Sequence, residues 1–427
     1  ILTVGIILGF FALTVGKPSA SEIFMVYPSD GDDTANIQAA FEDAKAAGPE
    51  STVQLAVGQF YTNAIFVEDF YGNFKGAGKD LTTIDVLKGK YPEEEGVVGP
   101  YGNHLFTFEG GDIYISDLGF EITPEKPAEE SYDGTYDLFT ILITGQINSR
   151  IERVKFTGHE GDQSGYPEGH SLEEKTYNVR LGVEYGGGLN GRHTITKCEF
   201  ESLWLGITAW RLLNCEVKIS LNSIKGGAIG IINAVSDNSK FEISRNDIET
   251  TYFGGIWVLQ DLPDWESASQ WLITHNTIKV LSDDSDGIFL GDFSSFKSLE
   301  AVVSHNKIIL VDVNYGGIWT SFLQDTIICN NIIRGTGDYG IGCAYAYNNL
   351  LLGNNVQNVD ASWAPVVLIF ATECVVVGGS TKTNVLNMFG TNNLIVGMNN
   401  MQDNSLGQEI QEAMEQKREL IQSFPKF

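Results

Sequence analysis

Apolar and polar positions along this chain repeat in a six-residue pattern. An apolar residue is followed by two variable residues, then Asn, one variable residue, and Ile or Val. The pattern occurs at residues 219–224, 243–248, 273–278, 303–308, 327–332 and 351–356. The successive Asn residues are 24, 30, 30, 24 and 24 positions apart. A period of this length indicates stacked supersecondary units, that is, a solenoid rather than an ordinary globular domain.

Each of these patterns is followed by a short apolar stretch that begins near a Gly, such as GGIWVLQ from Gly254 and GGIWTSF from Gly316. The stretches are rich in β-branched and aromatic residues and are bounded by Gly, Asp, Asn and Ser, which is typical of strands. Short strands with no helix between them predict an all-β fold. The economical arrangement is a parallel β-helix, in which each strand pairs with its equivalent one coil further on.

Side chains alternate between the two faces of a strand, so every second residue of these stretches faces outward. The aromatic residues at the outward positions are Trp210, Trp257, Phe289 and Trp319. An exposed aromatic run normally marks a groove or an interface, and aromatic faces suit the apolar faces of pyranose rings. We therefore predict that these four residues bind substrate. The alternative is that loops such as residues 261–270 cover the stripe and make it a second core.

The repeated Asn predicts a structural ladder at one corner of the coil. Asn tolerates the left-handed backbone conformation that a sharp corner needs better than most other non-Gly residues. Stacked on successive coils, its side-chain amides can hydrogen bond to one another. The predicted members of the ladder are Asn222, Asn246, Asn276, Asn306, Asn330 and Asn354.

The first residues differ from the rest of the chain. Residues 1–15 form an uncharged apolar run, and Lys17, Pro18 and several small residues follow it. We interpret residues 1–21 as a truncated signal peptide that lacks its Met and basic region, or else as a membrane-proximal segment. The run is shorter than the ~20 residues that a membrane span needs. We expect a mature chain without a stable span, secreted or at the cell surface.

Amphipathic patterns predict a helical cap at each end of the solenoid. The apolar stripe of the first helix consists of Ile37, Ala40, Phe41 and Ala44, and that of the second of Leu406, Ile410, Ala413, Leu420 and Ile421. Such caps cover the open strand edges that would otherwise promote aggregation. The predicted domains are therefore residues 1–21, a β-helix at 22–400, and a C-terminal capping helix at 401–427.

Three N-terminal segments carry a resemblance to a known superfamily. They read DDTANIQAAFEDA at residues 32–44, TVQLAVGQFY at 52–61 and FKGAGKDLTTI at 74–84. Together with the Asn coils that follow, they resemble the pectin-lyase-like superfamily. The resemblance implies a single-stranded right-handed parallel β-helix. It does not imply one activity, because the superfamily includes lyases, hydrolases, esterases, phage tailspikes and binding proteins.

The catalytic patterns of two enzyme families in this superfamily are incomplete here. Residues 284–286 read Asp-Ser-Asp where polygalacturonases carry Asn-Thr-Asp, and the Asp pair expected one coil later is missing. The Arg-x-Pro-x-x-Arg pattern of pectate lyases is absent, although Arg180 and Glu184 bring a cation and a carboxylate onto one predicted strand. The candidate catalytic residues are thus Asp286, Glu184 and Arg180. The alternatives are a turn Asp and a surface ion pair.

Charge narrows the range of partners. The chain has 55 acidic and 27 basic residues, a net charge of −28, which argues against a nucleic acid or an anionic membrane as partner. The same charge disfavours a polyanionic glycan unless metal ions or a local basic cleft intervene. Residues 158–175 form an insertion in which Glu160 and Asp162 are candidate Ca²⁺ ligands. The alternative is a disordered acidic loop.

The five cysteines show no CxxC spacing, so we predict neither a zinc site nor a disulfide framework. Taken together, the sequence predicts a secreted β-helix protein that binds a polysaccharide or cell-surface glycan on an outward strand face. Two function classes remain open. One is a polysaccharide lyase or glycoside hydrolase, and the other is a non-catalytic surface, structural or adhesive repeat protein.

Overall fold

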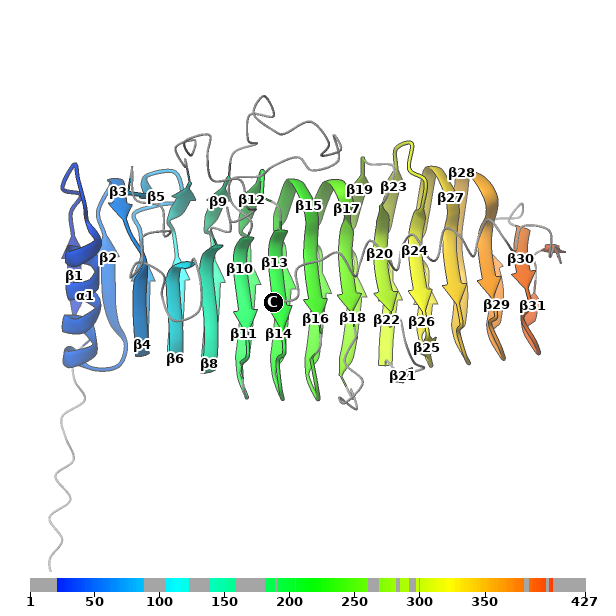
Figure 1. Cartoon of the computed structure of the whole chain (residues 1–427), viewed down its shortest axis with the longest axis horizontal. Coiled ribbons are helices and arrows are strands. Elements are labelled where there is room, and N and C mark those ends of the chain that lie inside the picture. Colours follow the sequence, from blue (N-terminus) through cyan, green and yellow to red (C-terminus); the bar gives the residue numbers. More distant parts are fainter. Residues whose placement is uncertain are drawn as a thin grey trace, which may run out of the picture.

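The computed structural model describes residues 21–87, 104–122, 139–158, 181–188, 190–203, 205–234, 236–259, 269–281, 285–291, 297–298, 300–379, 384–396 and 399–401. Equivalent strands of successive coils pair in parallel, and the coils stack side by side along the long axis of the molecule (Figure 1). The prediction of an all-β parallel solenoid is confirmed. The terminal predictions for residues 1–20 and 402–427 lie outside the described residues.

The strands form three parallel sheets that run along the solenoid. Sheet I contains β10 (Leu181–Gly186), β13 (Leu205–Trp210), β20 (Asp286–Gly291), β24 (Gly316–Ser321), β30 (Asn384–Met388) and β32 (Asn399–Met401). Sheet II contains β1 (Ile23–Val26), β2 (Ser51–Leu55), β11 (Arg192–Thr196), β14 (Glu216–Ser220), β16 (Lys240–Ser244), β18 (Gln270–Thr274), β22 (Glu300–Ser304), β26 (Ile327–Cys329), β29 (Val375–Gly379) and β31 (Leu394–Val396). Sheet III contains β3 (Gly58–Thr62), β5 (Thr82–Val86), β7 (Gly119–Glu121), β9 (Lys155–Thr157), β12 (Glu199–Glu201), β19 (Thr277–Val280) and β23 (Lys307–Leu310).

Longer strands bend from one sheet into the next. Those that pass from sheet I to sheet II are β4 (Ile65–Lys75), β6 (His104–Ser116) and β8 (Phe139–Glu152). Those that pass from sheet III to sheet I are β15 (Ser223–Ala234), β17 (Asp247–Leu259) and β27 (Ile332–Ala344), while β28 (Leu350–Ile369) crosses all three sheets. The short strands β21 (Lys297–Ser298) and β25 (Leu323–Gln324) pair separately.

Helix α1 (Thr34–Ala47) covers the N-terminal end of the solenoid, as the apolar stripe predicts (Figure 1). Its buried residues are the four predicted ones, and the ring of Phe41 packs 5.2 Å from those of Phe70 and Phe74. The carboxylate of Asp33 does not cap the helix; it accepts hydrogen bonds from the backbone amides of Ser29 and Tyr61. Asp33 therefore links the start of α1 to Ser29 in the preceding segment and to Tyr61 on β3.

The Asn ladder is present, with one predicted member replaced. Asn306 Nδ2 donates to Asn331 Oδ1 at 3.0 Å, and Asn331 Nδ2 donates to Asn354 Oδ1 at 3.0 Å. The prediction of Asn330 is therefore wrong by one position. Strand pairing places Val303 opposite Ile328, which shifts the pattern by one residue in this coil. The other members, from Asn222 to Asn306 and Asn354, join the ladder as predicted.

The prediction that the ladder Asn itself adopts the left-handed corner conformation is also corrected. In each of these coils the left-handed residue precedes the ladder Asn, with φ between 55° and 62° at Leu221, Arg245, His275, His305, Asn330 and Gly353. The Asn itself instead binds across coils: Asn276 Oδ1 accepts from both the backbone and the side-chain nitrogen of Asn246. The ladder Asn thus satisfies buried polar groups, while its neighbour makes the turn.

A second stack occupies left-handed positions at another corner. The residues are Phe322, Tyr345, Phe370 and Phe389, with φ of 54°, 47°, 47° and 52°. Their ring centroids are 4.4, 4.9 and 4.9 Å apart, with nearly parallel planes. Left-handed φ is unfavourable for bulky side chains, so ring stacking along four successive coils offsets a local backbone cost.

The five cysteines are free thiols, and four of them are buried. Burial raises the pKa of Cys198 and of Cys343 to about 12, so neither thiol is reactive at neutral pH. No helix in the described part of the chain has the length and hydropathy that a membrane span requires.

Candidate functional site

The predicted aromatic stripe is buried. Trp257, Phe289 and Trp319 face away from the axial core, as alternation predicts, but they are only 1%, 0% and 3% exposed. They belong to a second apolar cluster on the outer side of sheet I, against which the half-buried Trp210 packs. The prediction of an exposed aromatic groove at these residues is therefore wrong. The alternative of a second core describes them.

Asp286, the candidate acid from the Asp-Ser-Asp segment, lies in the same outer cluster at 1% exposure. It accepts a hydrogen bond from the Tyr339 hydroxyl at 2.6 Å and one from the backbone amide of Gly316 at 3.3 Å. Burial and the neighbouring Asp286 carboxylate raise the pKa of Tyr339 well above its usual range. These contacts describe a buried structural pair and no open catalytic carboxylate.

Glu184 is paired with a residue far away in the sequence. Its Oε2 atom lies 3.1 Å from Nε2 of His104, whose ring stacks on Phe139 at 4.7 Å. The predicted partner Arg180, and the predicted Ca²⁺ ligands Glu160 and Asp162, lie outside the described residues, so the Ca²⁺ site stays a prediction. Among the described residues, no three His, Cys, Asp or Glu side chains converge as a metal site would require.

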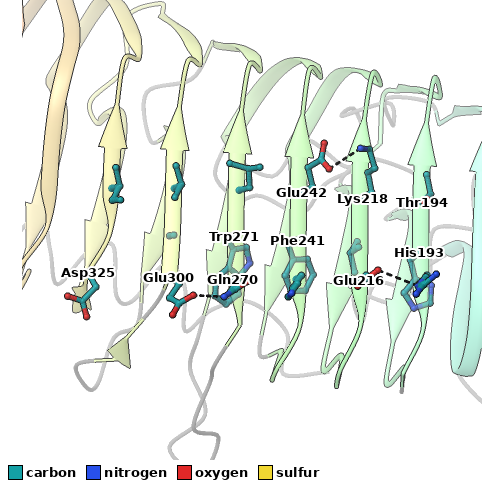
Figure 2. Close-up of a pocket in the computed structure, with 17 residues that line it drawn as sticks. His193, Thr194, Glu216, Lys218, Phe241, Glu242, Gln270, Trp271, Glu300 and Asp325 are labelled. Atoms are coloured by element: carbon teal, nitrogen blue, oxygen red, sulfur yellow. Dashed lines mark hydrogen bonds and ion pairs between the residues drawn. The ribbon is translucent and has the colours of Figure 1, made fainter.

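An open groove of about 770 Å³ lies instead on the outer face of sheet II (Figure 2). It crosses β11, β14, β16, β18, β22 and the start of β26. The strands are in register, so equivalent side chains form rows along the solenoid axis. One row consists of Arg192, Glu216, Lys240, Gln270 and Glu300, and the next of Thr194, Lys218, Glu242, Leu272, Val302 and Ile327.

Several charged side chains in the groove have a polar partner in the same row. Arg192 and Glu216 are 3.4 Å apart, Lys218 and Glu242 are 2.9 Å apart, and Gln270 donates to Glu300 (Figure 2). Burial opposes ionisation of Glu242, but hydrogen bonds from Lys218 and Ser244 lower its pKa below the usual range. Glu242 therefore stays anionic and is a poor general acid at neutral pH.

The groove changes character along its length. Its β11–β16 end carries ion pairs, whereas Leu272 and Ile327 at the other end are 41% and 37% exposed. Further along the same face, Leu352, Leu394 and Val396 are also exposed. One end thus offers ion pairs, and the other offers apolar contact beside the carboxylates of Glu300 and Asp325.

A group of ion pairs around Glu152 lies next to the β11 end of the groove, and we call it the Glu152 cluster. Its members are Lys75, Tyr114, Asp117, Arg150, Glu152, Arg153 and Lys197. Arg150 pairs in register with Thr194, which lines the groove. Burial opposes ionisation of Glu152, yet hydrogen bonds from Lys197 and Arg150 lower its pKa to about 2.

A polar group lies inside the solenoid beneath this end of the groove. His193 is 2% exposed, and its Nδ1 atom is 3.1 Å from Ser149 Oγ. The Tyr185 ring lies 4.5 Å from the imidazole, and burial lowers the pKa of His193 to about 4. Its Nε2 atom has no hydrogen-bond partner in the described part of the chain. His193 is therefore a neutral core residue.

Sequence reasoning missed the groove and the Glu152 cluster. The two groove rows lie five and three positions before the left-handed corner residue, where charged and apolar types alternate without a motif. In the cluster, Asp117, Arg153 and Lys197 are themselves left-handed residues, and no motif marks them. The repeated Asn could have revealed the two rows. When the sequences of successive coils are aligned on this Asn, the row residues fall at equivalent positions.

No family model and no curated protein match this sequence. Solved structures that resemble the fold include the following three. DFA-IIIase from Arthrobacter chlorophenolicus A6 in complex with GF2 has a TM-score of 0.56 at 10% identity, covering 84% of this chain and 94% of that chain. The periplasmic alginate epimerase AlgG has a TM-score of 0.51 at 14% identity, covering 83% and 84%. The catalytic unit of GH87 alpha-1,3-glucanase from Streptomyces thermodiastaticus strain HF3-3 has a TM-score of 0.50 at 12% identity, covering 91% and 71%.

At such identities the likeness is one of fold alone. These structures are right-handed parallel β-helices, and this chain has the same fold. The fold that the resemblance of the N-terminal segments implies, a right-handed parallel β-helix, is confirmed.

Proposed function

We propose that this protein binds an extended glycan along the groove of sheet II. The observation that carries the proposal is the regular array in the groove, where equivalent side chains recur on successive strands. Parallel strands are roughly 4.8 Å apart, so a linear polymer lying along the axis meets a new row member at each step. A repeating surface of this kind suits a repeating ligand better than a compact one.

Two further observations support a glycan. The structures named above include an epimerase of alginate and a glucanase, both of which act on polysaccharides. The net charge of −28 opposes the other common linear polymers, DNA and RNA. We also propose that the protein acts outside the cytoplasm, at the cell surface or in secreted form, on the strength of its apolar first residues.

Binding is the function that the groove favours over cleavage. Its carboxylates have polar partners: Glu216 forms an ion pair with Arg192, Glu242 pairs with Lys218, and Asp325 accepts from Asn348 at 2.7 Å. A general acid in a glycoside hydrolase needs a raised pKa, whereas that of Glu242 is lowered. The groove is therefore suited to ionic and polar contacts with sugar hydroxyls.

A second candidate function is cleavage of a polysaccharide on the outer side of sheet I. Here His104 and Glu184 form an imidazole–carboxylate pair with 3.1 Å between Nε2 and Oε2, a geometry that allows proton transfer. If this pair is catalytic, incubation with a glycan yields new reducing ends or unsaturated products, and Glu184→Gln removes them. Retention of a glycan without product leaves binding as the function.

The groove itself is tested with Leu272→Asp, which places a charge at the first apolar position of its row, next to Glu242. We expect retention on a panel of immobilised linear glycans to fall about tenfold, since an apolar contact with a sugar face is replaced by a hydrated carboxylate. The matched control is Val311→Asp, because Val311 is 40% exposed, close to the 41% of Leu272, and lies outside the groove.

Both variants should keep the melting temperature of the parent protein, because the substituted side chains are exposed. Equal retention by the parent, Leu272→Asp and Val311→Asp would rule out the groove as the binding site. Failure of the parent protein to retain any glycan of the panel would rule out the proposed function.

A further inference from the structure

The Glu152 cluster holds several cations around one nearly buried carboxylate. Glu152 is 3% exposed, and its Oε1 atom lies 2.7 Å from Arg153 and 3.0 Å from Lys197. Arg150 contacts the other oxygen, Oε2, which also accepts from the Tyr114 hydroxyl at 3.2 Å. The carboxylate thus fixes three cationic groups at one place on sheet II.

The cations are held in position by further contacts. Arg153 makes a bidentate pair with Asp117, at 2.6 and 2.8 Å. The guanidinium of Arg150 lies 5.2 Å above the ring of Tyr114, and the Lys75 ammonium lies 5.1 Å from the same ring. Cation–π and bidentate contacts restrict these long side chains, so little conformational entropy remains to be lost when a ligand binds.

The cluster has an excess of positive charge that the rest of the protein lacks. Its cations are Lys75, Arg150, Arg153 and Lys197, and its anions are Asp117 and Glu152. Two positive charges are thus left over in a chain whose net charge is −28. Mutual repulsion of closely spaced cations is relieved by a further anion.

The cationic side chains are also accessible. Arg150, Arg153 and Lys197 are 57%, 43% and 55% exposed, while the carboxylate between them is buried. Each retains N–H donors beyond those used by Glu152, since a guanidinium has five and an ammonium three. Donors that face solvent around a buried counter-charge are suited to receive an anionic oxygen.

We propose that the Glu152 cluster binds an acidic group, a carboxylate or a sulfate, of the glycan that lies in the adjacent groove. This inference rests on the proposed function, because Arg150 is one strand away from Thr194 at the charged end of the groove. It gives the ligand a direction: an acidic sugar lies over β8 and β11, and sugars that need only apolar or hydroxyl contacts lie over β18 and β22.

The experiment compares each acidic polymer with its neutral counterpart: alginate with carboxyl-reduced alginate, and dextran sulfate with dextran. Affinity electrophoresis at low salt measures retention of the parent protein, Arg150→Gln, Lys197→Gln and the control Lys279→Gln. Lys279 is the control because it is an accessible lysine, 41% exposed, that pairs with Glu249 on sheet III at 2.9 Å, away from the groove. The melting temperature of each variant monitors folding.

We expect the parent and Lys279→Gln to bind at least one acidic polymer about tenfold more tightly than its neutral counterpart, since charge-assisted hydrogen bonds are lost in the neutral one. Arg150→Gln or Lys197→Gln should remove most of that preference and leave neutral retention unchanged. The alginate and dextran sulfate arms tell a carboxylate ligand from a sulfate ligand.

Two results would overturn the inference while leaving glycan binding intact. One is equal retention of acidic and neutral polymers by the parent protein. The other is an acidic preference that survives in both cluster variants, which would make the cluster a structural ion network only. Should Arg150→Gln fail to fold, Lys197→Gln decides the question, because Lys197 makes a single contact with Glu152 and is 55% exposed.

Discussion

His193 illustrates how a single residue can make the stability of this solenoid depend on pH. The imidazole occupies an inward position between Ser149 on the preceding coil and Val217 on the next. Burial lowers its pKa from 6.5 to about 4, so the unfolded chain takes up the proton more readily than the folded one. The stabilisation is therefore complete above the unfolded pKa and is lost as the pH falls toward 4.

We predict that the urea midpoint of the parent protein falls between pH 7 and pH 5, with a total contribution from His193 of up to about 3 kcal/mol at lower pH. His193→Leu should show a shallower fall over the same range, because no proton is then taken up at this position. Equal slopes in the two proteins would mean that His193 is not the group responsible.

The contribution of Glu152 to stability is lost at a lower pH than that of His193. Its folded pKa of about 2 lies below the ordinary 4.5, so its contribution is present above 4.5 and is lost only at more acidic pH. The two groups can therefore be separated by measuring above pH 5.

At the scale of elements, the Asn ladder connects the coils at the corner between sheets II and III. Asn331 accepts from Asn306 on the coil before it and donates to Asn354 on the coil after it. Its Nδ2 atom also donates to the carbonyl of Val303 at 2.9 Å. Loss of one member leaves several buried polar groups unpaired at once.

Adjacent asparagines in one coil allow a matched test of this corner. Asn331→Ala should lower stability by about 2–4 kcal/mol, because the amide of Asn306 loses a buried acceptor. Asn330→Gly should change stability by less than about 1 kcal/mol, because Asn330 has φ of 55° and Gly adopts that conformation readily. Thermal unfolding measures both, and the reverse order of the two effects would contradict the corrected ladder.

At the scale of the whole molecule, the solenoid has two apolar regions. One fills the axis, with Ile256 and Ile288 fully buried, and the other lies outside sheet I and contains Trp257 and Trp319. The outer face of sheet II, by contrast, carries exposed residues and the groove. One face of the coil is therefore buried by packing, while another stays exposed and carries the groove proposed to bind a glycan.

The burial of Trp257 in the second apolar region predicts a large loss of stability when this side chain is removed. Trp257→Ala should lower the free energy of unfolding by about 3–5 kcal/mol, because a side chain that is 1% exposed leaves a cavity. Leu272→Ala, on the exposed face of sheet II, should change it by less than about 0.5 kcal/mol. A Trp257→Ala protein with an unchanged melting temperature would restore the interpretation of this stripe as an exposed binding face.

The sequence alone was enough to predict the coil repeat, the strands, the residues that face the core and the apolar stripe of α1. All of these depend on spacing within a short segment, and a β-helix repeats that spacing coil after coil. The identity of Asn331 did not follow, because two neighbouring Asn residues fit the local pattern equally. Pairing of Val303 with Ile328 decided between them.

Only the tertiary structure decided which outward face is buried. Alternation places Trp257 and Leu272 outward alike, but burial depends on what lies over a sheet, which strand periodicity does not encode. The Glu152 cluster likewise joins residues that are far apart in the chain, since Asp117 and Arg153 are 36 positions apart and Glu152 and Lys197 are 45 apart. These separations in sequence depend on the lengths of the intervening loops, which differ from coil to coil. The cluster and its excess of positive charge could therefore not be predicted without knowing how the coils stack.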